Sequence, residues 1–291
     1  MSLTGEVKKF ATEELDIDLV GITSVDRLSG APEGHRPTDL LPGAKSVIVM
    51  AVRLVQGVVQ AIFRAHEDGL RHAQCIYATY GYSLIPNLHL KFAAYRMARF
   101  LEKKGYVTTP IPSGPGGGGV PFSHRHAAVA AGLGEFGLMS IIVTPDYGPR
   151  VRFVSVITKA ELEPDPLYEG PKLCDPTKCD ICIKICPTNA ISASKLKRVV
   201  IGGRTFEYGT VDFAKCRIGT EGLLKKTLGF KDLPIPENPT WEDIDEVRKD
   251  IDPRQVREAI LIDRATWYCG KCLAYCPIGS GDQLKGNLKR G

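Results

Sequence analysis

CDICIKICP, at residues 179–187, and CGKCLAYCP, at residues 269–277, are two copies of one phrase, C-x2-C-x3-C-P. One further cysteine precedes each copy, Cys174 before the first and Cys216 before the second. Eight of the nine cysteines therefore fall into two matched arrays. Thiolates are soft ligands, which select iron–sulfur clusters or zinc over hard cations. The arrays predict a metal-binding fold in the carboxyl-terminal part of the chain.

The doubling of the phrase, and the proline after each final cysteine, favour iron–sulfur clusters over zinc. Two-cluster bacterial ferredoxins carry such runs, and the last cysteine of each run ligates the other cluster. We therefore expect two [4Fe–4S] clusters with interleaved ligands. One set would be Cys174, Cys179, Cys182 and Cys276, and the other Cys186, Cys216, Cys269 and Cys272. The x4 spacing between Cys174 and Cys179 departs from the usual x2 spacing.

Other uses of the cysteines fit the pattern less well. A disulfide framework is typical of short secreted chains, whereas this chain has 291 residues and no recognisable signal peptide. Structural zinc remains an alternative, because C-x2-C pairs also bind it. Cys75 belongs to neither array, and we expect it to be a small core residue.

Length and composition indicate that the clusters are only part of the protein. A ferredoxin needs about 60–80 residues, yet the first array begins only at residue 174. The hydrophobic content of 43% is ample for a packed core. The net charge of +5 is mild and its basic residues are scattered, which makes nucleic acid an unlikely partner. No apolar run is long enough to span a bilayer, so we expect a cytoplasmic protein.

Apolar periodicity predicts an α+β fold. Helices are expected at 3–14, 83–104 and 124–131, and strands at 18–25, 46–54 and 106–109 and in the runs SIIVTP and RVRFVSVITKA. The proline-rich stretch ELEPDPLYEGPK predicts a linker, so the domains are expected at 1–165 and 166–291. The second domain contains an insert at about 192–265, with a hairpin turning at Gly202-Gly203 and a helical segment, NPTWEDIDEVRKD.

Several phrases in the same order resemble the epoxyqueuosine reductase and reductive dehalogenase superfamily. They are LLPGAKSVIVMAVRL (40–54), AGLGEFG (131–137), TPDYGPRVRFVSVIT, ELEPD and the isolated Cys216. The resemblance implies a nitroreductase-like α/β domain that holds base-off cobalamin, followed by a two-cluster ferredoxin-like domain. It also implies that the clusters supply electrons to the cobalt.

The resemblance further implies where the cobalamin binds. Backbone groups of a glycine-rich loop, the Gly-Leu-Gly turn and the Tyr-Gly turn are the expected contacts. These residues are Gly118, Gly119, Gly132, Leu133, Gly134, Thr144, Tyr147 and Gly148.

One departure from the family bears on the substrate. Epoxyqueuosine reductases carry a catalytic aspartate ahead of the Gly-Leu-Gly turn, and a gapless count puts that position near Gly118, inside GGGG. The proton donor must therefore differ. A dehalogenase-type site uses a tyrosine near a cation, and we expect Tyr80 with Arg125 to fill these roles. The other candidates are Tyr77, Tyr82, His124 and His126, although each tyrosine also fits a packing role.

The sequence thus predicts a cobalamin- and [4Fe–4S]-dependent oxidoreductase acting on an unidentified small substrate. A low-potential donor such as ferredoxin or flavodoxin would supply its electrons. Two alternatives stay open: an electron-transfer or corrinoid-activating protein without a substrate of its own, and a tRNA epoxyqueuosine reductase.

Overall fold

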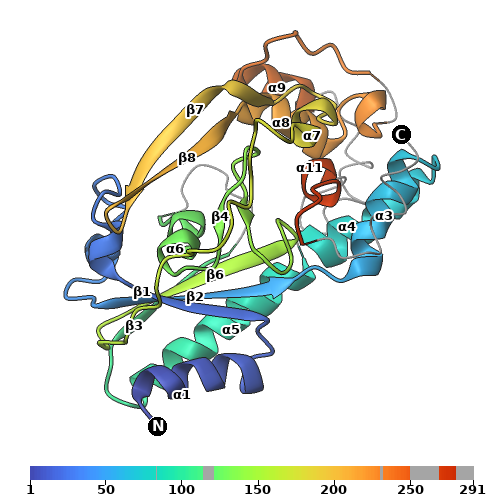
Figure 1. Ribbon diagram of the computed structural model, residues 1–291. Helices are drawn as coiled ribbons and strands as arrows, with labels where there is room; N and C mark the ends of the chain where they lie inside the picture. Colours follow the sequence, from blue (N-terminus) through green and yellow to red (C-terminus); the bar gives the residue numbers. More distant parts are fainter. Residues whose placement is uncertain (83, 114–120, 230–231, 250–268, 280–291) are drawn as a thin grey trace.

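A four-stranded antiparallel sheet forms the centre of the amino-terminal half, with strand order β1-β2-β6-β3 (Figure 1). The computed structural model describes residues 1–82, 84–113, 121–229, 232–249 and 269–279. The strands are β1 (Leu19–Ser24), β2 (Ser46–Arg53), β3 (Thr108–Ile111) and β6 (Val151–Thr158). In β2, Ile48 and Met50 face one hydrophobic cluster, whereas Val47 and Val49 face another. This sheet therefore has a core on both of its faces.

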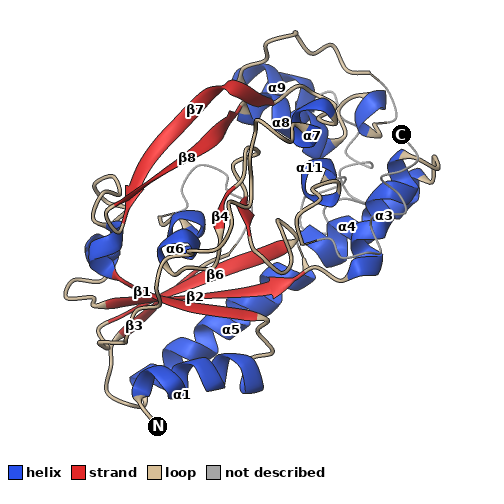
Figure 2. Ribbon diagram, viewed as in Figure 1, coloured by secondary structure: helices blue, strands red, loops and turns tan. Residues whose placement is uncertain are grey.

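Helices cover both faces of the sheet (Figure 2). On one face lie α1 (Leu3–Lys9), its π-helical continuation η1 (Phe10–Glu14) and the long α5 (Ile85–Glu102), which pack on β1, β2 and β6. On the other face lies α6 (His124–Ala130), whose alanines and Val129 are fully buried. The small alanine side chains let α6 approach the sheet closely, so the polar residues at its start lie beside β6.

Short elements join these layers, and a third helical group adjoins one end of the sheet. The group consists of α3 (Gln56–His66), η3 (Arg71–Ala73), α4 (Gln74–Tyr77) and η4 (Ala78–Tyr82). The other short elements are η2 (Val25–Leu28), α2 (Pro37–Leu40), β4 (Glu135–Phe136) and β5 (Ile142–Val143). Residues of α3 and α4 share a hydrophobic cluster with Leu273 and Ala274, so this group contacts the second cysteine array.

The cysteine-rich half packs against the first half through short helices and a long hairpin. The hairpin strands are β7 (Ile191–Ile201) and β8 (Arg204–Val211), and they turn at Gly202 and Gly203, whose φ angles are +56° and +78°. Such angles favour glycine. The helices are α7 (Ile181–Lys184), α8 (Phe213–Glu221), η5 (Lys225–Thr227), α9 (Trp241–Lys249) and α11 (Lys271–Ala274). Figure 1 shows the hairpin as a long arm between the helices α8 and α9 and the first half of the chain.

Most of the expected elements are confirmed within one or two residues, including the hairpin and its turn. Strand β3 begins two residues later than expected, and SIIVTP contributes only the two-residue β5. Cys75 was expected in the core but is exposed, because its neighbours Gln74 and Tyr77 occupy the buried side of α4. No helix among the described residues is both long and apolar enough to cross a membrane.

Candidate metal and cofactor site

The eight array cysteines fall into two groups. Within each group, neighbouring thiols raise one another's pKa. Burial, together with the neighbouring Cys174, Cys276 and Cys179, raises the pKa of Cys182 to about 12. We call these four the outer thiol group. Burial likewise raises the pKa of Cys216 to about 12, with contributions from Cys269 and Cys186. Burial and these three cysteines also raise the pKa of Cys272. We call Cys186, Cys216, Cys269 and Cys272 the inner thiol group.

Local backbone groups are arranged around the sulfurs. The amide of Leu138 donates to Cys174 Sγ at 3.3 Å, and the amide of Ala190 donates to Cys186 Sγ at 3.2 Å. Zinc would draw four sulfurs to about 2.3 Å from one point. Over the described ranges, no group of three or more His, Cys, Asp or Glu side chains converges closely enough to hold a single ion.

Arg150 joins the second cysteine array to the sheet. Its side chain is buried, with 6% exposed, and donates to the carbonyl oxygens of Leu273 at 3.0 Å and Cys276 at 2.8 Å, and also to that of Ile278. Arg150 comes directly before β6, so one residue links the sheet to the chain around the last cysteine. Burial lowers the pKa of this arginine, and the neighbouring Cys276 opposes that shift.

A cavity of about 980 Å³ lies between the two halves of the chain. Cofactor and ligand pockets span about 300–1,000 Å³, so this cavity is at the upper end of that range. All four cysteines of the inner thiol group line it, whereas none of the outer group does. The rest of its wall is mostly apolar and comes from α6, β6, the hairpin, α8 and α11.

Tyr77 lines the cavity close to Cys269 and Cys272 of the inner thiol group. It is fully buried, and its ring fills the space beside Gly81 and Gly270, where an added Cβ would overlap it. Its hydroxyl has no hydrogen-bond partner among the described residues. Burial raises the pKa of Tyr77 well above its usual value, although Arg152 lowers it in part. The phenol therefore stays protonated near pH 7.

Arg152 and His124 lie on the same side of the cavity. The guanidinium of Arg152 lies over the ring of Tyr82, 4.1 Å from its centroid. His124 Nε2 lies 3.0 Å from the carbonyl oxygen of Pro112, and Nδ1 lies 2.9 Å from the hydroxyl of Ser155. Burial and the nearby Arg152 lower the pKa of His124. This imidazole is therefore neutral near pH 7 and donates from Nε2, because a carbonyl only accepts.

Arg125 and His126 reach a different part of the same cavity. Arg125 Nη1 donates to the carbonyl and the hydroxyl oxygens of Ser140, at 2.5 and 2.6 Å. His126 Nδ1 lies 2.6 Å from the hydroxyl of Ser123, the residue that caps α6. Burial and, to a smaller extent, the adjacent Arg125 lower the pKa of His126 to about 4.

The structure brings some of the expected site residues to this cavity and not others. Arg125 lines it, as do Tyr77, Tyr82, His124 and His126, whereas Tyr80 does not and is 53% exposed on η4. The geometry therefore favours Tyr77 and Tyr82 over Tyr80. Sequence reasoning missed Asn87, Arg150 and Arg152 altogether.

The described residues among those expected to contact cobalamin do not line this cavity. Gly118 and Gly119 fall outside the described residues. None of Gly132, Leu133, Gly134, Thr144, Tyr147 and Gly148 lines the cavity. The glycines instead allow backbones to approach: a Cβ on Gly132 would overlap the carbonyl of Pro166, one on Gly134 that of Val143 and one on Gly148 that of Ile278. Thr144 closes the Tyr-Gly turn by donating its hydroxyl to the carbonyl of Gly148 at 3.1 Å.

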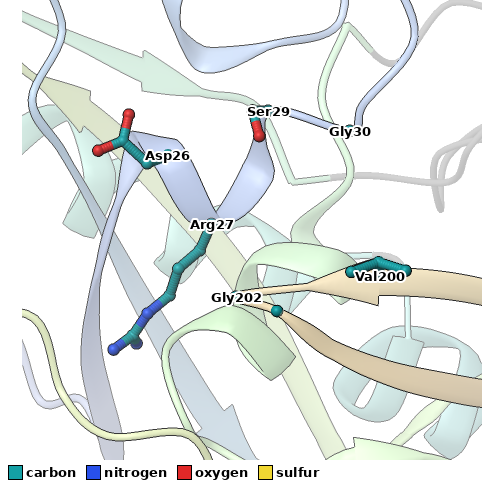
Figure 3. Close-up of a pocket in the computed structure, with 7 residues that line it drawn as sticks. Asp26, Arg27, Ser29, Gly30, Val200 and Gly202 are labelled. Atoms are coloured by element: carbon teal, nitrogen blue, oxygen red, sulfur yellow. The ribbon is translucent and has the colours of Figure 1, made fainter.

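A smaller hollow of about 370 Å³ lies at the tip of the hairpin, between η2 and Gly202 (Figure 3). Arg27 lines it, but its side chain extends away from Ser29 and Gly30. The guanidinium donates to the backbone carbonyls of Ala130, at 2.8 Å, and Asp165. This arginine fixes the end of the first half of the chain, so we assign the hollow no chemistry.

Known proteins resemble the chain in both sequence and fold. No family model matches it. Tetrachloroethene reductive dehalogenase from Sulfurospirillum multivorans is 28% identical over 188 residues, which are 64% of this chain and 28% of that protein. Epoxyqueuosine reductase from Bacillus cereus is 31% identical over 189 residues, which are 62% of this chain and 46% of that protein. The chain thus spans less than half the length of these curated relatives.

Solved structures of both kinds share the fold. An epoxyqueuosine reductase bound to an epoxyqueuosine-modified tRNA stem loop superposes with a TM-score of 0.58, at 22% identity, over 96% of this chain and 66% of that one. A catabolic reductive dehalogenase in complex with 3-bromo-4-hydroxybenzoic acid gives 0.55, at 20% identity, over 92% and 37%. The resemblance found in the sequence is confirmed: the chain is a homologue of both groups of proteins.

Proposed function

We propose that this homologue of reductive dehalogenases and epoxyqueuosine reductases is a cobalamin-dependent iron–sulfur reductase of a small substrate. The observation that carries the proposal is the position of the inner thiol group, whose four cysteines line the same large cavity as Tyr77 and Arg152. An electron source and a proton donor would then share one enclosed site. The substrate is not identified.

We assign the outer and the inner thiol groups as the ligands of two [4Fe–4S] clusters. Within each group the last cysteine before proline comes from the opposite array, as the interleaved motif of two-cluster ferredoxins requires. The pKa values of Cys182 and Cys216 are raised to about 12, mainly by burial, so these thiols need cations nearby to become thiolates. Iron would supply that charge. Cys272 of the inner group also interacts with Cys182 of the outer group, which supports two adjacent clusters.

The cavity is large and mainly apolar, as the ring of a corrin would require. Tyr77 and Asn87 are among its lining residues, and the Tyr77 hydroxyl and the Asn87 Nδ2 atom are buried without a partner among the described residues. Such groups are costly unless a ligand satisfies them. Cobalamin, when bound, would supply the low-potential cobalt that performs the reduction. We further propose that residues 1–165 form a nitroreductase-like domain, and residues 166–291 a ferredoxin-like domain with an insert at about 192–265.

The residues of the chain would bind the substrate, exclude water and deliver a proton. Tyr77 is the proposed proton donor, because it is a lining residue of the cavity and burial keeps it protonated. Arg152 lies close enough to lower the pKa of that phenol in part, and would stabilise the phenolate left after transfer. The apolar wall formed by Phe122, Phe153 and Ile142 would exclude water from this step. A low-potential ferredoxin or flavodoxin is the proposed electron donor.

The proposal can be tested on protein purified and reconstituted without oxygen. We expect about eight irons per chain, the sum of two four-iron clusters, and binding of cobalamin at micromolar concentration or below. Bound iron without corrinoid binding would make an electron-transfer protein the better description.

Reduction of epoxyqueuosine in tRNA is the second candidate, because one structural neighbour is a tRNA-bound epoxyqueuosine reductase. The glycine run near the expected aspartate argues against it, since general acid catalysis is worth about 10²–10⁴ in rate. We expect that the gene does not restore queuosine to tRNA in a cell without its own reductase. Restoration would establish the tRNA activity.

A further inference from the structure

Helices of the first half of the chain hold the beginning of the second cysteine array. Cys269 opens this array, belongs to the inner thiol group and lines the cavity. Its backbone carbonyl oxygen accepts a hydrogen bond from Gln74 Nε2 at 3.3 Å. Gln74 begins α4 and lies 195 positions earlier in the sequence. This hydrogen bond therefore connects the first half of the chain directly to a proposed cluster ligand.

Gln74 is well placed to orient Cys269. It is fully buried, and the packing around a buried amide fixes its direction. His66, the last residue of α3, also hydrogen-bonds to the backbone of Cys269. Residues that bond to a metal ligand from behind commonly orient that ligand and tune the metal. The helices α3 and α4 thus set the position of the Cys269 backbone.

The same helices also contact the array on the other side of Cys269. The ring of Tyr77 fills the space beside Gly270, whose φ angle is +66°. Further along, the ring of Tyr275 lies 4.6 Å from that of Phe63, and its hydroxyl donates to the carboxylate of Glu67. The array therefore cannot shift along α3 and α4 without breaking these contacts, which keeps the amide and the carbonyl together.

A cation makes the corresponding contact in the outer thiol group. There, Arg150 donates to the carbonyl oxygen of Cys276 at 2.8 Å, whereas the donor to Cys269 is a neutral amide. Nearby charges and oriented dipoles set the reduction potential of an iron–sulfur cluster. An N–H group that points its positive end at a ligand favours the reduced, more negative cluster. A neutral amide does so less strongly than a guanidinium.

We propose that Gln74 is a positioning residue that sets the reduction potential of the inner cluster through the carbonyl of Cys269. The inference rests on the proposed function, because it requires a cluster on the inner thiol group. It assigns a role to a residue outside the ligand set, which acts on the cluster through one of the ligands. Since the inner group lines the cavity, this potential would determine how readily an electron reaches a group bound there.

The test measures both potentials in one sample. Reconstituted protein is titrated with a reductant at controlled potential, and the reduced clusters are counted by electron paramagnetic resonance. The signal that is missing from Cys216→Ser belongs to the inner cluster. Gln74→Met keeps a side chain of similar length but loses the donor. At a fixed potential, we expect its ratio of reduced to oxidised inner cluster to fall by about threefold or more, as for the loss of one hydrogen bond. The outer potential should stay unchanged.

Two further variants control this comparison. Gln60→Met makes the same change at an exposed position of α3 and should leave both potentials as they are. Gln74→Asn covers the case in which methionine disturbs the fold. Its amide is one carbon too short to reach the carbonyl, so it should lower the same potential.

A full complement of iron with the parent potentials, in both variants of Gln74, would refute the role. Loss of the inner cluster in both would show that Gln74 only supports the fold, and would refute it as well. No corrinoid is needed for the measurement. A shifted inner potential in protein that binds no corrinoid would therefore overturn the proposed function and leave this inference standing. A parent protein without iron–sulfur clusters would contradict both.

Discussion

Replacement of Arg150 by glutamine should release the second cysteine array from the sheet. The guanidinium donates to three carbonyl oxygens, those of Leu273, Cys276 and Ile278, from a buried position. Hydrogen bonds from a charged donor contribute about 1.5–3 kcal/mol each, and the cost of burying the cation offsets part of that sum. Because glutamine is too short to reach all three oxygens and leaves some unsatisfied, we expect a loss of about 3–5 kcal/mol in the free energy of unfolding.

The assay combines urea unfolding, followed by circular dichroism, with the iron content of the reconstituted protein. Cys276 belongs to the outer thiol group, so iron should fall from about eight to about four per chain as the outer four-iron cluster is lost. Arg53→Gln removes an arginine that is 60% exposed and should change the free energy of unfolding by less than about 1 kcal/mol. An Arg150→Gln protein with eight irons and the stability of this control would refute the anchoring role.

Three further outcomes are expected. Cys216→Ser should lose the inner cluster and retain about four irons, and eight irons would remove Cys216 from the ligand set. Gly132→Ala should lower the free energy of unfolding more than Gly203→Ala does. Both glycines have positive φ angles, +73° and +78°, but only at Gly132 would the new methyl group overlap a backbone oxygen. Equal costs of about 1 kcal/mol, from the backbone strain alone, would contradict the close approach. The pKa of His126 is about 4 in the folded chain, against an ordinary value of 6.5 in the unfolded chain. As the pH drops from about 6.5 to 4, the unfolded chain therefore binds a proton before the folded chain does, and the free energy of unfolding falls. The expected loss is about 2–3 kcal/mol, and His126→Phe should flatten this part of a pH–stability profile; an unchanged slope would show that the imidazole is not held neutral.

Local patterns in the sequence predicted much of the fold. The continuous apolar run SVIVMAV predicted a strand buried on both faces, and Gly202-Gly203 predicted the hairpin turn, because these signals depend on neighbouring residues alone. The doubled cysteine phrase similarly predicted the two groups in which the structure brings the thiols together. Their ligation of iron stays a prediction.

The cavity wall was much less predictable. Arg152 lies in β6 and Arg150 lies directly before it, and the sequence of this strand predicts only burial. The partners of Arg150 are more than a hundred residues away in the sequence, and Tyr82, the partner of Arg152, is 70 residues away. Tyr77 and Tyr80 are three residues apart in one phrase, and only the packing beside Gly81 and Gly270 decides which of them is buried. The glycines at 132 and 148 were expected at the cofactor, whereas their close contacts are with other backbone segments. Such choices depend on tertiary contacts that no local pattern records.

The central claim is that the inner cluster and a corrinoid share one cavity. Anaerobic titration of the eight-iron protein with cobalamin, followed by the absorbance of the corrinoid, tests it most directly. We predict saturable binding of one corrinoid per chain at micromolar concentration or below. Protein with a full complement of iron that binds no corrinoid at these concentrations would contradict the account.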